Sequence, residues 1–407
     1  MGSISEDNHT SVAMAAQSQP ANNPFVYYED GFHLQLNGNL NGMDVDVSSE
    51  TSVDERKRKR LSSFFEENSF RHILVLSGAG TSIAAGGKTR EGLWTSCEKE
   101  IKAVVKAAGK YPLYGEGDKD IEMFLSYAER LCSVLEDGDL NNAVVVLKKA
   151  ILGYCSLTYK ASNDHANLLR KLTARKPGLP RVEVFTTNYD TLFEQAARES
   201  GFVVIDGFSF SFPRTFSGRN FDLDIVNRER TRLKGEENFI PNVIHLLKLH
   251  GSVDWFRDSE GIIEQRIGKE AEEPLIIYPS SEKYAASYDQ PYFEMMSRFQ
   301  TALRRDNTLL IVLGFGFADK HLNNTIIEAV RQNPGFHLLV ADYGHSSGGI
   351  DLEKYQNLFR QIDGNISIVY ASFHDFVEAL PMNKSYSIQR FDQTYPVQGG
   401  RNEHGTI

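Results

Sequence analysis

The sequence predicts an α/β protein built on a doubly wound, Rossmann-like parallel sheet with an inserted helical subdomain. Short apolar runs alternate with segments of helical period over most of the 407 residues. Such alternation is typical of a parallel sheet flanked by helices. The first strongly apolar run is followed at once by a glycine-rich turn, and a long block of purely helical periodicity then interrupts the alternation.

The composition is that of an ordinary globular protein, with 41% apolar and 24% charged residues. The net charge of −10 argues against a general nucleic-acid coat. No window approaches the ~18 consecutive apolar residues of a membrane span, and the N-terminus lacks the apolar core of a signal peptide, so we expect a cytoplasmic protein. The three cysteines, Cys97, Cys132 and Cys155, form no CxxC pair, so neither a disulfide framework nor a structural zinc site is expected.

The N-terminal region reads as a flexible arm, because residues 1–22 are polar and show no periodicity. Residues 24–39 contain two strand-like pieces around Asp30-Gly31, a favourable hairpin turn. This hairpin is either an arm that docks on a neighbouring subunit or partner, or a flexible leader with chance patterning. We divide the chain into an arm of residues 1–53, a main domain of residues 54–384 and a tail of residues 385–407.

The main domain is organised around a predicted strand, Ile73 to Leu76, and the turn that follows it. Gly78 and Gly80 let the backbone turn sharply and approach a ligand closely. The small residues after them can open a helix whose N–H groups and dipole favour a phosphate. The alternative is a tight strand-to-helix turn that binds nothing, since the third glycine of the dinucleotide fingerprint is not at its usual spacing.

Two helical regions flank this strand. Residues 54–69 read as a helix whose basic run, Lys57 to Arg60, we interpret as a solvated face rather than a nuclear address or nucleic-acid patch. Residues 95–176 show four stretches of helical period and form the predicted inserted subdomain. Asp118 or Asp120, and Asp164, are the expected helix-start residues.

After residue 176 the alternation resumes. Residues 207–242 break it and are expected to form a loop-rich insertion. The predicted strands are 182–185, 202–205, 243–249, 275–278, 309–313, 336–341 and 366–370. A loop and helix are predicted at 186–200, and further helices at 293–305, 319–332, 352–362 and from Phe373.

Small or polar residues follow five of these strands directly. Ligands of open α/β sheets bind at the carboxyl ends of strands, near a switch in strand order. Five such ends therefore predict one common crevice. The residues are Gly78 with Gly80, Asn188 with Asp190, His250 with Gly251, Gly314 with Gly316, and Asp342.

Each polar residue has a functional and a structural interpretation. Asn188 and Asp190 can bind sugar hydroxyls or a carboxamide, or can cap the next helix. His250 can act as a general base, or can be a partly buried histidine bonded to backbone. Asp342 can bind an adenosine ribose or be an ordinary loop residue. The Asp319/His321 pair lacks further metal ligands at useful spacing, so Asp319 is expected to be a helix cap.

As a set, these motifs resemble the sirtuin family over about residues 70–380. GAGTS is similar to its phosphate turn, TTNYD to its TQN-x-D loop, KLHGS to its His-Gly catalytic segment and LGFGFADKHLN to its ribose loop. The chain departs from protein-deacylating sirtuins in three ways. It lacks their two CxxC pairs, and its phosphate turn is followed by IAAGGKTREGLW, which contains no PDFR run. Its TTNYD also replaces their TQNID. GFGFADKHLN, IIYPSSEKY and the helical insertion look instead like the divergent sirtuin-like domains of bacterial antiphage systems.

The resemblance implies a function and a set of roles. It implies an oligomeric NAD⁺ glycohydrolase that depletes NAD⁺ in abortive infection. Assembly with a HerA-type hexameric ATPase would regulate this activity, and the protein would contact nucleic acid only indirectly, through that partner. Asn188 would position the nicotinamide ribose and the attacking water, and His250 would act as base. The residues implied to hold NAD⁺ are Gly78, Ala79, Gly80 and Ser82 at the pyrophosphate, Asp190 at the carboxamide, and Gly314, Gly316 and Asp342 at the adenosine half.

Two other functions remain open from the sequence. One is an NAD⁺-dependent protein deacylase, against which the missing cysteine pairs count. The other is a non-catalytic NAD⁺-binding scaffold for an ATPase or nuclease partner. No cluster of nuclease metal ligands is evident.

Overall fold

A computed structural model gives the fold. The predicted leader 1–22 and the tail from residue 385 lie outside the described residues, as do Tyr278 and most of the predicted helix 352–362. The structure describes residues 26–27, 32–35, 53–117, 119–160, 164–176, 178–227, 239–266, 274–277, 289–343, 354–355, 358 and 365–383.

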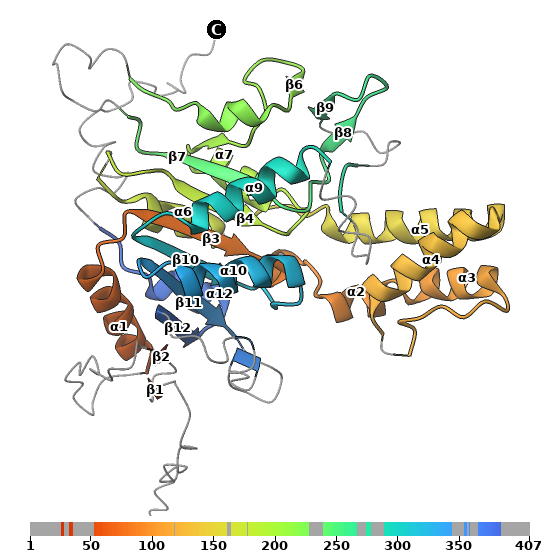
Figure 1. The fold of residues 1–407 in the computed structure, drawn as a ribbon, viewed down its shortest axis with the longest axis horizontal. Coiled ribbons are helices and arrows are strands. Elements are labelled where there is room, and N and C mark those ends of the chain that lie inside the picture. The colour runs from red at the N-terminus through yellow and green to blue at the C-terminus, as the bar shows by residue number, and fades with distance from the viewer. Residues whose placement is uncertain are drawn as a thin grey trace, which may run out of the picture.

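A nine-stranded sheet forms the centre of the molecule, in the order β1-β2-β12-β11-β10-β3-β4-β7-β5 (Figure 1). The seven strands from β12 to β5 pair in parallel, which confirms the predicted fold class. Their bounds are β3 (His72–Ser77), β4 (Val182–Thr186), β5 (Val203–Ile205), β7 (Val243–Lys248), β10 (Thr308–Leu313), β11 (Phe336–Asp342) and β12 (Asn365–Tyr370).

The two strands of the predicted N-terminal hairpin lie at one edge of this sheet. β1 (Val26–Tyr27) pairs antiparallel with β2 (Phe32–Gln35). β2 in turn pairs antiparallel with β12. In this conformation the hairpin extends the chain's own sheet.

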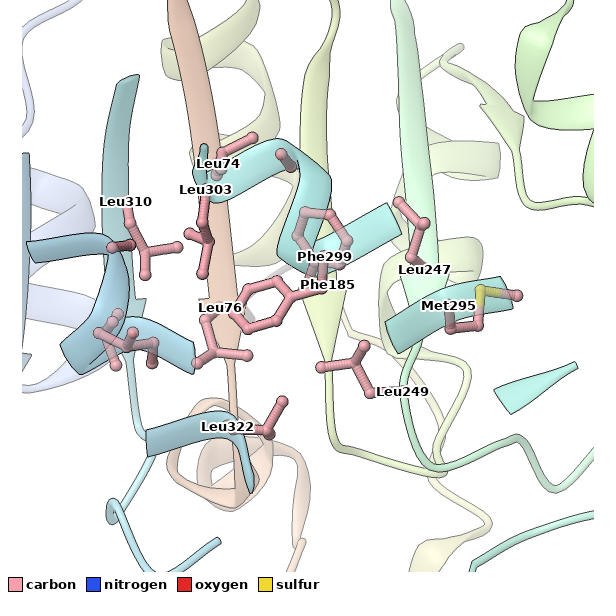
Figure 2. Close-up of a cluster of buried hydrophobic side chains, with 14 of the residues drawn as sticks. Leu74, Leu76, Phe185, Leu247, Leu249, Met295, Phe299, Leu303, Leu310 and Leu322 are labelled. Atoms are coloured by element: carbon pink, nitrogen blue, oxygen red, sulfur yellow. The ribbon is translucent and has the colours of Figure 1, made fainter. Parts of the chain in front are cut away.

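Helices cover both faces of the sheet, because successive strand residues point to opposite faces and both sets are apolar. On one face, α9 (Tyr292–Leu303) and α10 (Lys320–Gln332) lie over the strands. The opposite face carries α1 (Val53–Glu67), α6 (His165–Thr173), α7 (Leu192–Glu199) and α12 (Phe373–Ala379). Figure 2 shows the first core, where the strand residues Leu74, Leu76, Phe185, Leu247 and Leu310 meet Met295, Phe299, Leu303 and Leu322 of the helices.

The predicted helical insertion projects from the sheet and has a core of its own (Figure 1). Its helices are α2 (Arg90–Ser96), α3 (Glu98–Ala108), α4 (Ile121–Leu135) and α5 (Gly138–Cys155). Helix α6 falls within the predicted range 95–176 but packs on the sheet core. Asp120 accepts from the N–H of Met123 at the start of α4, as expected. Asp164 makes no side-chain cap bond, and its carboxylate pairs with His374 instead.

Two regions differ from the sequence prediction. The expected strand at 275–278 is only an isolated bridge between Gly251 and Ile276. Its backbone groups bond to the segment after β7, since the N–H of Ile277 donates to the carbonyl of His250 at 2.9 Å. The predicted loop-rich region contains β6 (Arg214–Thr215), which joins β9 (Ile263–Gln265) and β8 (Trp255–Arg257) in a second, three-stranded sheet.

Among the helices of the described ranges, none combines the length and apolar character needed to cross a membrane.

Candidate active site

The five strands predicted to carry the site are consecutive in the sheet. They stand in the order β11-β10-β3-β4-β7 and are parallel, so their carboxyl ends share one edge. The chain leaves β3 for β4 on one side and returns later to β10 on the other. This change of direction makes β3 and β10 a topological switch point, where open α/β sheets bind ligands.

Two glycine-rich turns meet at that switch point: the β3 turn (Gly78–Ser82) and the β10 turn (Gly314–Asp319). The N–H of Gly80 donates to the carbonyl of Gly314, and the N–H of Gly78 donates to that of Leu313, both at 2.9 Å. A Cβ on Gly80 would lie 2.5 Å from the Cα of Gly314. These two glycines are therefore required for the contact between the turns.

This contact engages two backbone donors of the β3 turn. The N–H groups of Gly78 and Gly80 both donate to backbone carbonyls of Leu313 and Gly314, and the role of these glycines at a pyrophosphate stays a prediction. Within the described residues, Ala79 is the exposed position of this turn whose N–H has no hydrogen-bond partner. The helix that follows is also a short 3₁₀ helix, η1 (Ala79–Ala85), rather than the expected α-helix.

Asn188 is held in one orientation by the β3 turn. It lies in the β4 loop (Thr187–Thr191), and its Nδ2 donates to the carbonyl of Gly78 and to Ser82 Oγ, both at 2.9 Å. With the amide nitrogen fixed, Oδ1 is the remaining group, and it accepts no hydrogen bond from the described residues. Asn188 thus presents an oriented acceptor at the carboxyl edge of the sheet.

Asp190 lies behind Ser82. Ser82 Oγ donates to Asp190 Oδ2 at 2.6 Å, and the N–H of Leu192 donates to Oδ1 at 3.1 Å. Both carboxylate oxygens are thus engaged, and the residue is buried. In this conformation Asp190 orients Ser82 and the start of α7; its predicted contact with a carboxamide stays a prediction.

Sequence reasoning missed Lys248, a fully buried ammonium at the end of β7. Its Nζ donates to the carbonyl of Asp190, to Ser252 Oγ at 2.7 Å and to Glu194 Oε1 at 3.0 Å. Burial alone lowers the pKa of Lys248, but the carboxylates around it outweigh burial and raise the pKa above its ordinary value. Lys248 therefore ties the β4 loop to β7. Its signal in the sequence is a charge inside the apolar run LLKLH.

His250 faces an acidic partner at the carboxyl edge of the sheet. Its Nε2 lies 3.4 Å from Asp319 Oδ2, and the two side chains are 13% and 11% exposed. Asp319 Oδ1 accepts from the N–H groups of His321 and Leu322, which confirms that Asp319 caps α10. Gly251 follows with a φ of +83°, and a Cβ there would collide with the carbonyl of Leu275. Glycine is thus required beside His250.

Asp342 and Gly316, which were predicted to hold the adenosine half, lie in different surroundings. Asp342 Oδ2 accepts from Tyr355 Oη at 2.5 Å and lies 3.8 Å from Lys354 Nζ. Its carboxylate is thus engaged two strands away from the β3 turn. At Gly316 an added Cβ would meet nothing within 4 Å, so that turn borders open space.

Tyr189, between Asn188 and Asp190, joins this site to the helical insertion. Its ring packs against the core of the insertion, beside Ile276. Its hydroxyl donates to the carbonyl of Ile277 at 2.6 Å. A displacement of the helical insertion would therefore move Tyr189, and with it the β4 loop.

Three groups at this edge have no hydrogen-bond partner among the described residues: the Ala79 N–H, Asn188 Oδ1 and the imidazole Nδ1 of His250. The first can donate a hydrogen bond, the second can accept one, and the third can do either. Gly78 and Gly80 bring the two turns together through backbone contacts. Among the described residues, no group of three or more His, Cys, Asp or Glu side chains is arranged to hold a metal ion.

Part of this site lies in a segment that is similar to a known protein family. Residues 182–359 match the family described as a SIR2-like domain. The comparison with curated proteins returned no match. A solved structure described by the words "structural basis of sirtuin substrate affinity" is 15% identical and aligns over 79% of this chain and 97% of its own, with a TM-score of 0.34. The SIR2-like match begins at β4 and includes Asn188, His250 and the β10 turn, so this part of the chain is similar to a SIR2-like domain.

Proposed function

We propose that this protein hydrolyses NAD⁺ to nicotinamide and ADP-ribose. The observation that carries the proposal is the fixed amide of Asn188. Hydrogen bonds to the carbonyl of Gly78 and to Ser82 Oγ hold its nitrogen. Its Oδ1, which accepts no hydrogen bond from the described residues, lies beside the turn predicted to face the pyrophosphate. The His250 segment is tied to the same loop, because the N–H of Val253 donates to the carbonyl of Tyr189 at 3.0 Å.

The chemistry asked of these residues is limited. The bond between C1′ of the ribose and the nicotinamide nitrogen breaks, and its electron pair leaves with nicotinamide. Asn188 Oδ1 accepts from the attacking water or a ribose hydroxyl and orients it, which favours reaction by proximity. His250 takes the proton that the water loses as its oxygen bonds to C1′. The proton then passes to solvent, so the reaction yields ADP-ribose, nicotinamide and one proton.

The test is NAD⁺ turnover by the purified chain, followed by nicotinamide release. We expect Asn188→Ala to lower kcat on the order of 100-fold, since a preorganised polar contact of this kind contributes about that much. Asn167→Ala is the matched control, because Asn167 is also half-buried and bonded to a neighbouring side chain, Arg170. Full activity of Asn188→Ala would refute the assignment of the site.

Two other functions give different results in the same assay. Release of O-acetyl-ADP-ribose from an acetylated peptide would identify a deacylase. Tight NAD⁺ binding without turnover, even with partner present, would identify a scaffold. Release of nicotinamide and ADP-ribose without formation of O-acetyl-ADP-ribose supports the proposed hydrolase.

We further propose that the protein acts in antiphage defence together with a HerA-type ATPase and as an oligomer in the cytoplasm. The motif resemblance supports this, and Tyr189 offers a route by which a partner bound to the helical insertion would reach the β4 loop. NAD⁺ turnover measured with and without the ATPase tests it. An unchanged rate over a range of ATPase concentrations would contradict regulation by assembly.

A further inference from the structure

A carboxylate outside the predicted set of site residues faces the proposed base. Asp319 Oδ2 lies 3.4 Å from His250 Nε2, although the two residues stand on loops that follow different strands, β10 and β7. In the sheet those strands are separated by β3 and β4. The contact therefore spans the carboxyl edge above the two loops that hold Asn188.

The orientation of Asp319 is set before it reaches His250. Its Oδ1 accepts from the N–H of His321 at 2.9 Å and from the N–H of Leu322 at 3.2 Å, which closes the first turn of α10. A carboxylate held in this way has its second oxygen aimed in one direction. That oxygen points at the imidazole.

The pairing determines which nitrogen of His250 can act. An ionised carboxylate only accepts hydrogen bonds, so the nitrogen facing it carries the proton. The other nitrogen, Nδ1, then holds a lone pair, and it has no hydrogen-bond partner among the described residues. A histidine with a carboxylate at one ring nitrogen and a lone pair at the other can act as a general base. The carboxylate then stabilises the imidazolium that forms when the base takes a proton.

We infer that Asp319 is the positioning residue of His250: it holds the imidazole as the Nε2–H tautomer and leaves Nδ1 as the base. The inference rests on the proposed hydrolysis of NAD⁺ for its catalytic consequence. It also links the two halves of the site, since the carboxylate that orients the base belongs to the β10 turn, which is predicted to hold the adenosine half.

The decisive variant is Asp319→Asn. Asparagine caps a helix about as well as aspartate, so α10 keeps its first turn. Its amide nitrogen, however, donates to His250 Nε2, which moves the imidazole proton to Nδ1 and removes the base. We expect kcat to fall on the order of 100-fold, with KM changed less than about threefold.

A matched control and a second variant separate positioning from folding. Asp137 caps α5 by accepting from the N–H groups of Asp139 and Leu140, the same pattern as Asp319, but faces no histidine. Asp137→Asn should leave kcat unchanged. Asp319→Ser keeps a capping oxygen and removes the carboxylate, so it should lower kcat with the same thermal midpoint as the wild type.

A spectroscopic measurement tests the inference without turnover. In protein labelled with ¹⁵N-histidine, the His250 signals, assigned with His250→Gln, should show the Nε2–H tautomer in the wild type and the Nδ1–H tautomer in Asp319→Asn. An Nδ1–H tautomer in the wild type, or a kcat of Asp319→Asn above half the wild-type value, would overturn the assignment. A wild type that shows the Nε2–H tautomer but never cleaves NAD⁺ would overturn the proposed function and retain Asp319 as the residue that orients His250.

Discussion

The β3 turn and the β10 turn both contain two glycines, but the glycines do different things. At the β3 turn, Gly78 and Gly80 are enclosed, and an added Cβ on either would strike the backbone of Gly314 or Phe315. At the β10 turn, Gly314 makes that contact with a φ of +60°, while Gly316 borders open space. Similar motifs thus yield one turn tied into the protein and one partly free turn.

The difference shows where the chemistry of each turn resides. The tied turn offers little backbone to a ligand, and its contribution is Ser82, which orients Asn188 and is bonded to Asp190. The freer turn reaches across the edge through Asp319 to His250. We therefore expect substitutions at the β3 turn to affect mainly the free energy of unfolding, and substitutions at the β10 turn to affect mainly NAD⁺ turnover.

The largest effect on stability is expected for Lys248→Met, at the end of β7, where Lys248 donates to the β4 loop beside the β3 turn. Methionine leaves Glu194 and the carbonyl of Asp190 without their buried partner, and loss of one member of a buried ion pair costs about 3–5 kcal/mol. Urea unfolding measures the loss. Lys102→Met, which breaks an exposed pair with Glu98, should not shift the unfolding midpoint. A cost for Lys248→Met below about 1 kcal/mol would show that the cation does not hold the loop.

Gly80→Ala tests the contact between the turns themselves. The new Cβ would lie 2.5 Å from the Cα of Gly314, and because both atoms belong to backbone neither can move cheaply. We expect a loss of about 3 kcal/mol in the free energy of unfolding, the upper end for overpacking. Gly316→Ala, in the freer turn, should stay within about 0.5 kcal/mol of the wild type. Equal effects of the two variants would remove the distinction drawn between the turns.

Ser82→Ala is expected to cost about 2 kcal/mol, because it leaves Oδ2 of the buried Asp190 carboxylate without its hydrogen-bond donor. It also removes one of the three hydrogen bonds that orient the Asn188 amide, so kcat should fall together with stability. Thermal unfolding and nicotinamide release are measured on the same preparation. Ser133→Ala, which removes an exposed bond from Ser133 Oγ to the carbonyl of Arg130 in α4, should change neither.

Tyr189→Phe is expected to have the smallest effect on stability, about 1 kcal/mol, from the lost bond to the carbonyl of Ile277. Tyr154→Phe removes a comparable bond, from Tyr154 to the carbonyl of Ser96, within the helical insertion. The two variants should be destabilised alike, but only Tyr189→Phe should change kcat, since only Tyr189 lies in the β4 loop. Equal kcat values would contradict a link from the insertion to Asn188.

Much of the fold follows from local patterns. The apolar run before the first glycines is β3, and the runs at 309–313 and 336–341 are β10 and β11 within one residue. The run at 275–278 was predicted as a strand but forms only a bridge, because its backbone bonds go to the loop after β7, at His250 and Ser252, and to Trp255 at the start of β8. Apolar residues indicate burial in both cases, and periodicity does not tell a ladder from a packed loop.

The sequence by itself determined the parallel sheet, its inserted helices and the clustering of polar residues at one edge, because side-chain period and strand direction are local properties. Only the tertiary structure decided that Gly78 and Gly80 serve a contact between turns, that Asp190 lies behind Ser82, that Lys248 is buried beneath the β4 loop and that Asp319 faces His250. Each of these depends on atoms brought together from distant parts of the chain. No period or motif encodes such a pairing, since it is set by how the loops pack once the sheet has formed.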